Sequence, residues 1–456
     1  MPPTPQPARD APFLPKSWLQ RYDSVRLTRD SDGAVLDLPV GSSILSFLDY
    51  NPRWFVDRLV ESHGRTLFTL GLDMTNSCTD ACPMCFTMAK RKADGLNLHL
   101  DVDLTLRRMA ELRAAYPDTF RLVMMSGSGE PLNLPGVEEL LDGVADLGLA
   151  IRVYTAGKKL NKERVRRAVL RSAVAVRLSV DAVDEETFRT VHAAEGLDER
   201  LDSIRALVEE RDRSGATTLI GAHFVIQRDN WRQIVPFAEQ TRRLGCDYVS
   251  YSQETYGHVA GGFTRAEFQR MIADLNAVEQ LHDDDFGVMV PRLTARPTVL
   301  AFDKDFTADE RVLDGCHHSR QHIFFGVRND FSACCLAGMD ADFARESRLG
   351  PLADDRTMTG VRAVVEQGVG SALGRPAKLS CNSCMMNGYN TVLDKIFHFL
   401  DGETSWDCGL LPYVPGRSRA TDYELVMKGV EEQERLAART GTAERPPTLL
   451  PVVNAD

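Results

Sequence analysis

Three closely spaced cysteines constrain this chain more than any other feature of its 456-residue sequence. Cys78, Cys82 and Cys85 stand at spacings of four and three, so their thiolates can converge from one short loop. Thiolates are soft ligands that suit iron–sulfur clusters. Three of them leave one iron of a four-iron cube without a protein ligand, whereas closed clusters usually take four cysteines. A structural zinc site normally has four ligands built from two pairs, so the trio predicts an open cluster, with a chance grouping as the alternative.

Residues 78–85 resemble the Cys-x3-Cys-x2-Cys signature of the radical S-adenosylmethionine (SAM) enzymes, and they follow a strand-like run, Thr66–Asp73, as in that family. The resemblance implies a [4Fe–4S] cluster whose open iron site binds the amino and carboxylate groups of SAM. It also implies that the reduced cluster cleaves SAM to a 5'-deoxyadenosyl radical. The family usually has an aromatic residue before the third cysteine; here Met84 stands there and Phe86 follows the cysteine. Because the family's adenine contact at this position is mostly through backbone, the resemblance still assigns Met84 and Phe86 to cofactor binding.

Strand-like and helix-like segments alternate from residue 66 onward. Six strands with helices between them predict a parallel sheet with right-handed crossovers. The cysteine loop follows the first strand, at the carboxyl end where parallel barrels collect their chemistry. Six units rather than eight resemble the open (β/α)6 partial barrel of the radical SAM family, so an α/β fold of that type is expected. The expected strands are Thr66–Asp73, Arg121–Met125, Ala150–Tyr154, Val174–Val180, Thr218–Ile226 and Tyr248–Ser252.

The second expected strand ends in residues 126–131, with the letters SGSGEP. Small residues let the backbone approach a ligand closely, and a carboxylate can pair with an ammonium group. An ordinary turn is the alternative for this run. It resembles the family's Gly-Gly-Glu motif, which binds the amino group of SAM, and relatives also use residues at the ends of the next two strands. By this resemblance the cofactor-binding residues are Ser128, Gly129, Glu130, Thr155 and Ser179.

Polar residues near the carboxyl ends of the last three strands are candidates for contact with substrate. Asp181 shares a strand face with Ser179, although a helix-capping role for Asp181 or Asp184 is equally compatible. His223 alternates with apolar neighbours, which suits either a satisfied core histidine or a ligand. Asp181 and Glu254 are expected catalytic residues because a carboxylate can take a proton from a substrate hydroxyl. The candidates for binding a hydroxyl-rich, amine-bearing substrate are Asp181, Tyr251, Gln253 and Glu254.

A second group of cysteines lies in the C-terminal third of the chain, around an expected hairpin at Gly326–Ser332. Their spacing resembles the twitch domain, the shortened SPASM domain of many radical SAM enzymes. That resemblance implies one auxiliary [4Fe–4S] cluster on four cysteines, with zinc as the alternative for four thiolates. The cluster ligands are assigned to Cys316, Cys334, Cys381 and Cys384, with Cys335 as the alternate for Cys334. Cys246 is expected to be a buried small residue, while Cys335 and Cys408 are candidate hydrogen-atom donors in catalysis.

Composition excludes several partners. The chain has 54 basic and 65 acidic residues, a net charge of −11, whereas nucleic-acid binders show a basic footprint. No apolar run approaches the roughly 18 residues of a membrane span, and the N-terminus lacks a signal-peptide pattern. Ten cysteines in such a chain indicate metal ligands and a cytoplasmic protein.

The expected parts are a disordered tail (1–15), an N-terminal cap (16–65), the partial barrel (66–283), the twitch-like domain (284–410), and a C-terminal helix with a tail (411–456).

Together these features predict an enzyme that abstracts a hydrogen atom from a carbinol carbon of a polar small molecule. The twitch relatives that the spacing resembles include dehydrogenases of aminocyclitols in antibiotic biosynthesis, so dehydrogenation of an aminoglycoside-like substrate is expected. The alternatives are diol dehydration with a partner reductase, epimerisation through a cysteine hydrogen-atom donor, modification of a ribosomally made peptide, and a non-catalytic metal-binding scaffold. A flavodoxin- or ferredoxin-like protein is the expected electron donor.

Overall fold

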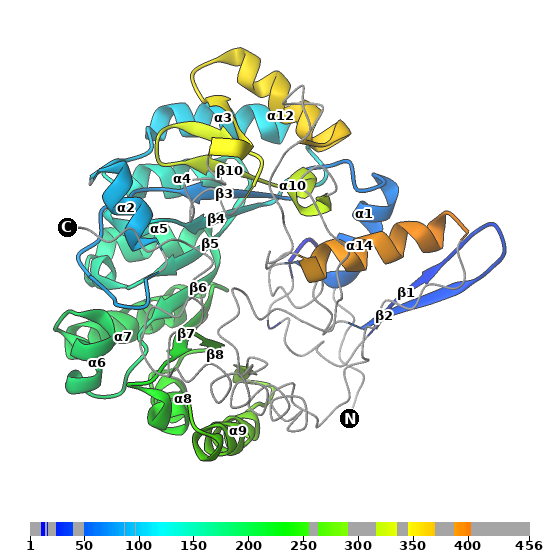
Figure 1. The fold of residues 1–456 in the computed structure, drawn as a ribbon. Coiled ribbons are helices and arrows are strands. Elements are labelled where there is room, and N and C mark those ends of the chain that lie inside the picture. Colours follow the sequence, from blue (N-terminus) through cyan, green and yellow to red (C-terminus); the bar gives the residue numbers. More distant parts are fainter. Residues whose placement is uncertain are drawn as a thin grey trace, which may run out of the picture.

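The computed structural model describes residues 11–13, 16, 24–39, 50–85, 87–95, 97–254, 263–290, 316–334, 345–369 and 387–402. They form one ten-stranded sheet and a separate two-stranded hairpin (Figure 1). The hairpin consists of β1 (Ser24–Thr28) and β2 (Val35–Pro39). The strands of the large sheet are β3 (Thr69–Asp73), β4 (Leu122–Ser126), β5 (Ala150–Thr155), β6 (Ala173–Ser179), β7 (Leu219–Ile226), β8 (Tyr248–Gln253), β9 (Gly287–Met289), β10 (His322–Gly326), β11 (Asp330–Ser332) and β12 (Arg348–Pro351).

The large sheet has the strand order β12-β11-β10-β3-β4-β5-β6-β7-β8-β9. All pairings from β10 across to β9 are parallel, and β11 and β12 extend one edge as antiparallel strands. Parallel neighbours need crossover connections, which the intervening helices supply. The carboxyl ends of the parallel strands therefore meet along one edge, where loops can carry a functional site.

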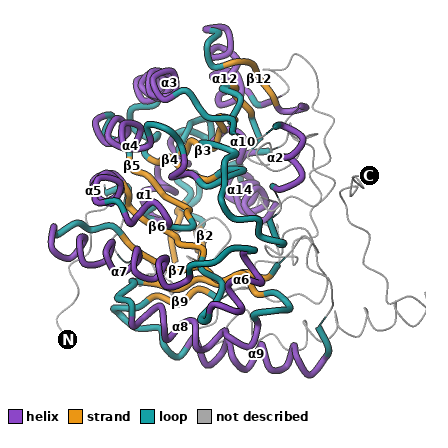
Figure 2. Tube along the Cα trace, turned by 90° about the vertical axis from the view of Figure 1, so that its left-hand side faces the viewer, coloured by secondary structure: helices purple, strands orange, loops and turns teal. Residues whose placement is uncertain are grey.

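Helices cover the outer, convex face of the curved sheet, and Figure 2 shows the strands inside this helical layer. The strand residues that face the helices, such as Leu72, Val153 and Phe224, are completely buried in the main core. Such apolar strands are typical of a parallel sheet that is covered by helices. The helices are α1 (Pro52–Glu61), α2 (Met88–Asp94), α3 (Val102–Ala115), α4 (Val137–Asp146), α5 (Glu163–Ser172), α6 (Glu185–His192), α7 (Leu197–Ser214), α8 (Ile234–Arg243), α9 (Arg265–Glu279), α10 (His317–Gln321), α12 (Asp355–Gln367) and α14 (Asn387–Leu400).

A second core closes the opposite, concave face at the amino ends of the strands. Trp54 and Phe55 on α1 belong to one buried cluster with Val392 and Ile396 on α14, and Leu122 at the start of β4 joins it. The side chains of Trp54 and Phe55 are buried, with exposed fractions of 5% and 6%. The cap packs against a helix that lies more than 300 residues later in the sequence.

The six predicted strands are present in the predicted order, as β3 to β8, which confirms the α/β partial-barrel fold. The sheet is wider than the sequence predicts. Strand β9 has three residues, too few to show a periodic pattern. Strand β10 forms the predicted hairpin with β11, but it also pairs with β3, so the sheet continues beyond position 283.

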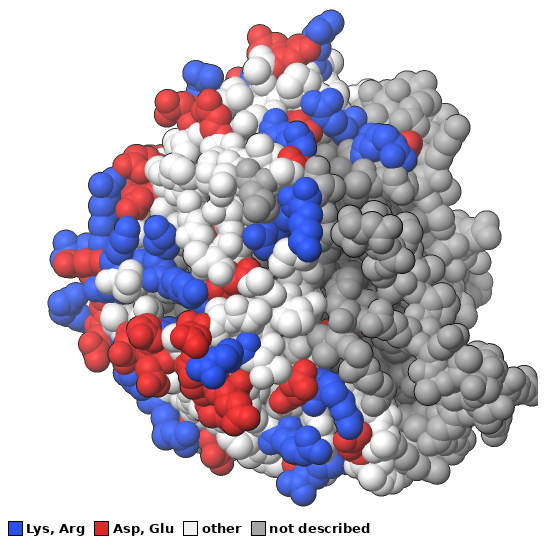
Figure 3. Space-filling view, turned by 60° about the vertical axis from the view of Figure 1, so that its left-hand side comes forward, with Lys and Arg blue, Asp and Glu red and all other residues white. Residues whose placement is uncertain are grey.

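The face in Figure 3 carries Lys and Arg side chains intermixed with Asp and Glu. Charges of opposite sign are also paired in the described part of the chain, as Arg171 is with Asp142 and Asp146. The described residues of this face therefore do not form the continuous basic surface that a phosphate backbone would need. Among the helices in the described ranges, none has both the length and the apolar character required to cross a bilayer.

Candidate functional site

The loop with the three cysteines leaves the sheet at the carboxyl end of β3, and the loop after β4 packs directly against it. A Cβ atom on Gly129 would lie 2.6 Å from backbone atoms of residues 75–77. The next residue, Glu130, donates its backbone N–H to the Ser77 carbonyl oxygen at 2.9 Å. Glycine is required where two backbones approach this closely. Gly129 therefore serves the contact between these two loops.

Asp73, the last residue of β3, joins the same two loops from below. Its carboxylate accepts hydrogen bonds from the backbone N–H of Ser128 at 2.7 Å and from the Ser128 hydroxyl at 2.9 Å. Burial raises the pKa of Asp73 to about 6, although the bonds from Ser128 act in the opposite direction. The Ser128 hydroxyl is thus directed at Asp73, which sequence reasoning did not single out.

Asp73 predicts a specific pH dependence of stability. Burial raises the pKa of Asp73 from its ordinary value of 3.8 to about 6, so its stabilising contribution is complete below about pH 3.8 and is lost as the pH rises through about 6. We expect the unfolding free energy of the cluster-free protein to fall by roughly 3 kcal/mol across this window on account of this group. Urea unfolding at pH 4 and pH 6.5 should show a smaller fall in Asp73→Asn. Asp146→Asn, at an exposed position on α4, is the control and should show the same fall as wild type. If Asp73→Asn also showed the wild-type fall in unfolding free energy between pH 4 and pH 6.5, the raised pKa of Asp73 would be contradicted.

Glu130 and Thr155, assigned to the cofactor site from separate motifs, are in direct contact. The buried Glu130 carboxylate accepts hydrogen bonds from the Thr155 hydroxyl, from the N–H of Ala156 at 2.7 Å and from the N–H of Leu132 at 3.3 Å. Burial raises the pKa of Glu130. A carboxylate offers about four lone-pair sites, so three protein donors leave capacity for the ammonium group of a ligand.

Asp80, inside the cysteine motif, anchors the loop to the rest of the sheet edge. Its carboxylate lies 2.8 Å from Arg200 Nη2 and 2.8 Å from Lys158 Nζ. Burial opposes ionisation, but these two cations lower the pKa of Asp80 to about 2. Arg200 also donates to the Ser179 carbonyl oxygen at 2.9 Å. It therefore ties the cysteine loop to the carboxyl end of β6.

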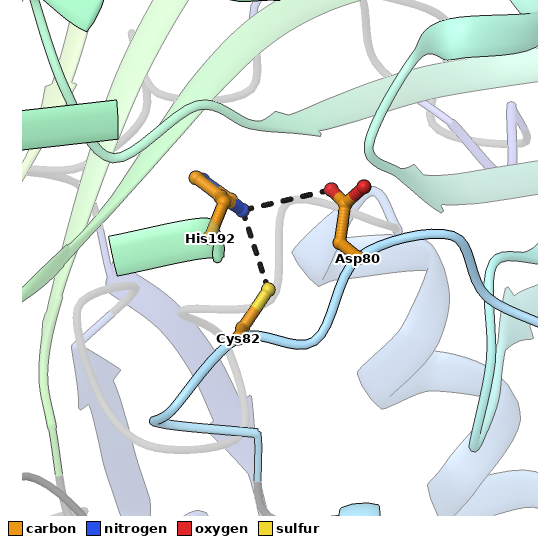
Figure 4. A group of neighbouring side chains, drawn as sticks. All are labelled: Asp80, Cys82 and His192. Atoms are coloured by element: carbon orange, nitrogen blue, oxygen red, sulfur yellow. Dashed lines mark hydrogen bonds and ion pairs between the residues drawn. The ribbon is translucent and has the colours of Figure 1, made fainter. Parts of the chain in front are cut away.

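His192 connects the cysteine loop to the segment after β6 (Figure 4). Its Nδ1 lies 3.3 Å from Cys82 Sγ and 3.7 Å from an Asp80 oxygen. Its Nε2 lies 3.0 Å from the Val180 carbonyl oxygen and 3.1 Å from Asp181 Oδ2. The Val180 carbonyl can only accept, so Nε2 carries a proton. Burial acts to raise the pKa of Asp181, but His192 outweighs it and the pKa is lowered.

The thiols of Cys78, Cys82 and Cys85 are free and half-buried, as ligands at the open edge of a site should be. Burial raises the pKa of the Cys78 and Cys82 thiols, whereas metal binding would deprotonate them. Asp80, Cys82 and His192 also converge within 4.8 Å. However, Asp80 is already paired with two side-chain cations, which disfavours another cation between these three residues. The donor set therefore fits a cluster on the three thiols.

Tyr251 does not face the mouth of the partial barrel, so its expected contact with substrate is wrong. Its ring lies in the main core between sheet and helices, and its hydroxyl donates to the Ile234 carbonyl oxygen of α8 at 2.8 Å. Side chains alternate along a strand, so the neighbours Ser250 and Ser252 occupy the concave face instead. His223 is on that face too, where its nitrogens lie 2.8 Å and 3.0 Å from the hydroxyls of these two serines.

Asp181 is completely buried, and its Oδ1 accepts a hydrogen bond from the N–H of Val225 at 2.6 Å. This placement does not support the expected contact with substrate. The capping alternative is realised by Asp184, whose Oδ1 accepts from the N–H of Thr187 in the first turn of α6. Glu254 directly follows β8 and is half-buried, with its N–H donating to the Ile226 carbonyl oxygen at 2.9 Å.

Cys316 and Cys334 are both buried, and burial together with the nearby Cys334 raises the pKa of the Cys316 thiol. The two cysteines flank the β10–β11 hairpin, as predicted. Met84 is half-buried in the cysteine loop, and Cys246 is buried in the main core, as predicted. The remaining predicted residues lie outside the described part of the chain: Phe86, Cys335, Cys381, Cys384 and Cys408. For Gln253 only the backbone is described.

Besides Asp73, sequence reasoning missed four ionisable residues of the site. Asp80 stands inside the cysteine motif, and an acidic residue in such a short loop is a signal that the sequence does offer, because a buried carboxylate needs a partner. His192 and Arg200 lie more than 100 residues from the loop that they contact, and no local pattern marks them. Lys158, just after Gly157 at the end of β5, reaches Asp80 from a third loop.

Comparisons with known proteins show what this chain resembles. Residues 72–240 match the family model described as the radical SAM superfamily. A tungsten-containing aldehyde ferredoxin oxidoreductase cofactor-modifying protein of Pyrococcus furiosus is 25% identical over 186 residues, which cover 40% of this chain and 50% of that protein. A probable GTP 3',8-cyclase of Saccharolobus islandicus is 22% identical over 191 residues, covering 42% and 58%. The matches thus span little more than half of these relatives.

Among solved structures, Streptococcus suis SuiB bound to S-adenosylmethionine is similar in fold, with a TM-score of 0.51 at 13% identity over 80% of this chain and 89% of that chain. A second SuiB structure has a TM-score of 0.50 at 14% identity, covering 84% and 93%. At this identity the likeness concerns the fold alone. The match over residues 72–240 is therefore a resemblance to the radical SAM superfamily, and that resemblance implies a [4Fe–4S] cluster and SAM.

Proposed function

We propose that this protein cleaves SAM reductively and uses the 5'-deoxyadenosyl radical to abstract a hydrogen atom from a carbinol carbon of a polar small molecule, which it dehydrogenates. The observation that carries the proposal is the convergence of the three-cysteine loop with the Glu130–Thr155 pair at the carboxyl edge of the parallel sheet. A bound cluster and SAM would supply the radical at this edge.

Each part of the edge has a proposed task. Cys78, Cys82 and Cys85 would hold the cluster, and Glu130, with its remaining acceptor capacity, would bind the ammonium group of SAM. The ion pairs of Asp80 with Arg200 and Lys158 hold the surrounding loops in place before any ligand binds, which lowers the cost of ordering these loops later. The residues proposed to line the rest of the SAM site are Met84, Phe86, Ser128, Gly129, Thr155 and Ser179.

Dehydrogenation of a carbinol removes one hydrogen atom, one proton and one electron. Glu254, half-buried after β8, is the proposed proton acceptor. The proposed electron acceptor is an auxiliary [4Fe–4S] cluster on Cys316, Cys334, Cys381 and Cys384. The electron for SAM cleavage would come from a flavodoxin- or ferredoxin-like partner in the cytoplasm.

The surroundings of Cys316 support this auxiliary site. The Asn390 side-chain oxygen accepts a hydrogen bond from the His318 N–H at 3.0 Å, which directs its Nδ2 toward Cys316 Sγ at 3.5 Å. An amide N–H aimed at sulfur stabilises a thiolate, as in iron–sulfur proteins. Asn390 belongs to the first turn of α14, which begins three residues after Cys384. The later cysteines are thus adjacent in sequence to a helix that contacts Cys316.

The proposal is tested by anaerobic reconstitution followed by incubation with SAM and dithionite. We expect 5'-deoxyadenosine as a product and about eight irons per chain, against about four if only the radical cluster forms. With a turned-over substrate, a product lighter by two hydrogens supports dehydrogenation. Loss of water would instead indicate the dehydratase, and unchanged mass with solvent deuterium the epimerase. Absence of 5'-deoxyadenosine would contradict the proposed function as a whole.

A further inference from the structure

The concave face of the sheet has an apolar floor and a polar layer above it. Ala175, Leu219 and Tyr248 form a small buried cluster on the floor. The Tyr248 ring lies across Gly221, where a Cβ atom would come within 2.3 Å of the ring. Arg177 follows Ala175 by two residues on β6, so it lies on the same face, one step closer to the carboxyl edge.

Two guanidinium groups gather in this polar layer around one aromatic ring. Strand register places Tyr154 beside Arg177 and Arg152 beside Ala175, so all four residues share the concave face. The guanidinium carbon of Arg177 lies 4.1 Å from the centre of the Tyr154 ring, and that of Arg152 lies 5.8 Å from it. Stacking on an aromatic face is a common way to hold an arginine ready for a planar anion.

No carboxylate in the described part of the chain neutralises Arg177. It forms no ion pair with a carboxylate of the described residues, and its buried Nε has no hydrogen-bond partner among them. Arg177 as a whole is half-buried, and a buried guanidinium N–H such as its Nε–H is costly unless an acceptor satisfies it. A carboxylate or phosphate fits because it can accept two parallel hydrogen bonds from the guanidinium fork.

The described neighbouring groups add hydroxyls and an imidazole. His223 is paired in register with Ser179 on one side and Ser250 on the other. Burial, reinforced by the positive charge of Arg177, lowers the pKa of His223 to about 3, so the imidazole is neutral at physiological pH. Its nitrogens engage the hydroxyls of Ser250 and Ser252. The layer therefore offers fixed positive charge beside neutral hydrogen-bonding groups.

Arg177 lies two residues below Ser179, which is a separation of roughly 7 Å along the strand. A different arginine, Arg200, lies at the carboxyl edge of the sheet, where it contacts the Ser179 carbonyl oxygen and Asp80. The Arg177 layer is thus deeper in the concave face than the edge proposed for SAM.

We propose that Arg177, with Arg152 and Tyr154, forms a subsite for an anionic group of the substrate, a carboxylate or a phosphate. This inference rests on the proposed function and narrows it: the substrate is a hydroxylated molecule that carries an anion, not one whose charges are all ammonium groups. The anion would bind deep in the concave face and leave the reacting carbon near the carboxyl edge.

The test is calorimetric binding of three probes to the reconstituted protein: inorganic phosphate, glutarate and the aminocyclitol 2-deoxystreptamine. We expect at least one anion to bind, with an affinity at least about tenfold weaker in Arg177→Gln. Arg171→Gln, at an exposed arginine on α5, should bind as the wild type does. Whichever of phosphate and glutarate binds more tightly shows whether the subsite prefers a phosphate or a carboxylate group. Iron content and circular dichroism verify that each variant folds. If Arg177→Gln does not fold, Arg177→Lys takes its place in the test. This variant keeps the positive charge but loses the guanidinium fork, so it should bind the anion more weakly than wild type does.

Three outcomes would overturn the subsite: neither anion binds, Arg177→Gln binds them as tightly as wild type, or 2-deoxystreptamine binds more tightly than both. Competition with saturating SAM is a further check, because displacement of the anion would show that Arg177 serves the SAM carboxylate. Binding is measured without turnover. A failed 5'-deoxyadenosine assay would therefore refute the proposed function separately from the anion result.

Discussion

Cys82→Ala is expected to reduce formation of 5'-deoxyadenosine to the background rate. The substitution removes one of three thiolates that must hold a cluster with an open iron. It also removes the partner of His192 Nδ1, which lies 3.3 Å from Cys82 Sγ. A cluster left with two protein ligands is expected to be lost during reconstitution. Iron and sulfide content, with the visible absorbance of the reconstituted protein, measures this directly.

Cys246→Ala provides the matched control for this substitution. Cys246 is also buried, but it precedes β8 at the opposite end of the sheet and belongs to the hydrophobic core. Its replacement should cost about 1 kcal/mol of stability and leave SAM cleavage intact. If the auxiliary cluster is present, Cys82→Ala should retain about half of the wild-type iron. SAM cleavage by Cys82→Ala at the wild-type rate would remove the basis for the proposed function.

Local patterns predicted the sheet and its direction well because the helix-facing positions of each strand in the partial barrel are apolar and helices separate the strands. They also located the cysteine loop and the Glu130 turn, since both motifs are contiguous in sequence. They chose the wrong face of β8, taking Tyr251 in place of Ser250 and Ser252. The end of this strand is short and polar, so its sequence does not show which side chains face the helices. Only the register with β7 decides this.

The parts that sequence could not predict are contacts between distant segments. His192 and Arg200 reach the cysteine loop from helices more than 100 residues later, because β6 lies three strands away from β3 in the same sheet. Likewise, the pairing of β10 with β3 depends on the whole path of the chain. Charged residues on helices are usually solvated, so neither His192 nor Arg200 stood out from its neighbours.

Gly129→Ala is expected to displace the cysteine loop and lower both stability and cluster content. A methyl group there would stand 2.6 Å from backbone atoms of residues 75–77, and backbone cannot turn aside as a flexible side chain can. Overpacking of this kind typically costs about 1–3 kcal/mol. Because the displaced residues lead directly into Cys78, we also expect a lower iron content and slower SAM cleavage than in wild type.

The matched control is Gly360→Ala in α12, where a Cβ atom would meet nothing within 4 Å. Alanine in a helix interior is favoured over glycine by up to about 1 kcal/mol, so this variant should be slightly more stable than wild type. The thermal unfolding midpoint should therefore fall in Gly129→Ala and rise slightly in Gly360→Ala. The iron content should fall in Gly129→Ala and stay at the wild-type level in Gly360→Ala. If Gly129→Ala matched wild type in both, the glycine would not be needed for the loop contact, and its place in the motif would have to be explained by the ligand instead.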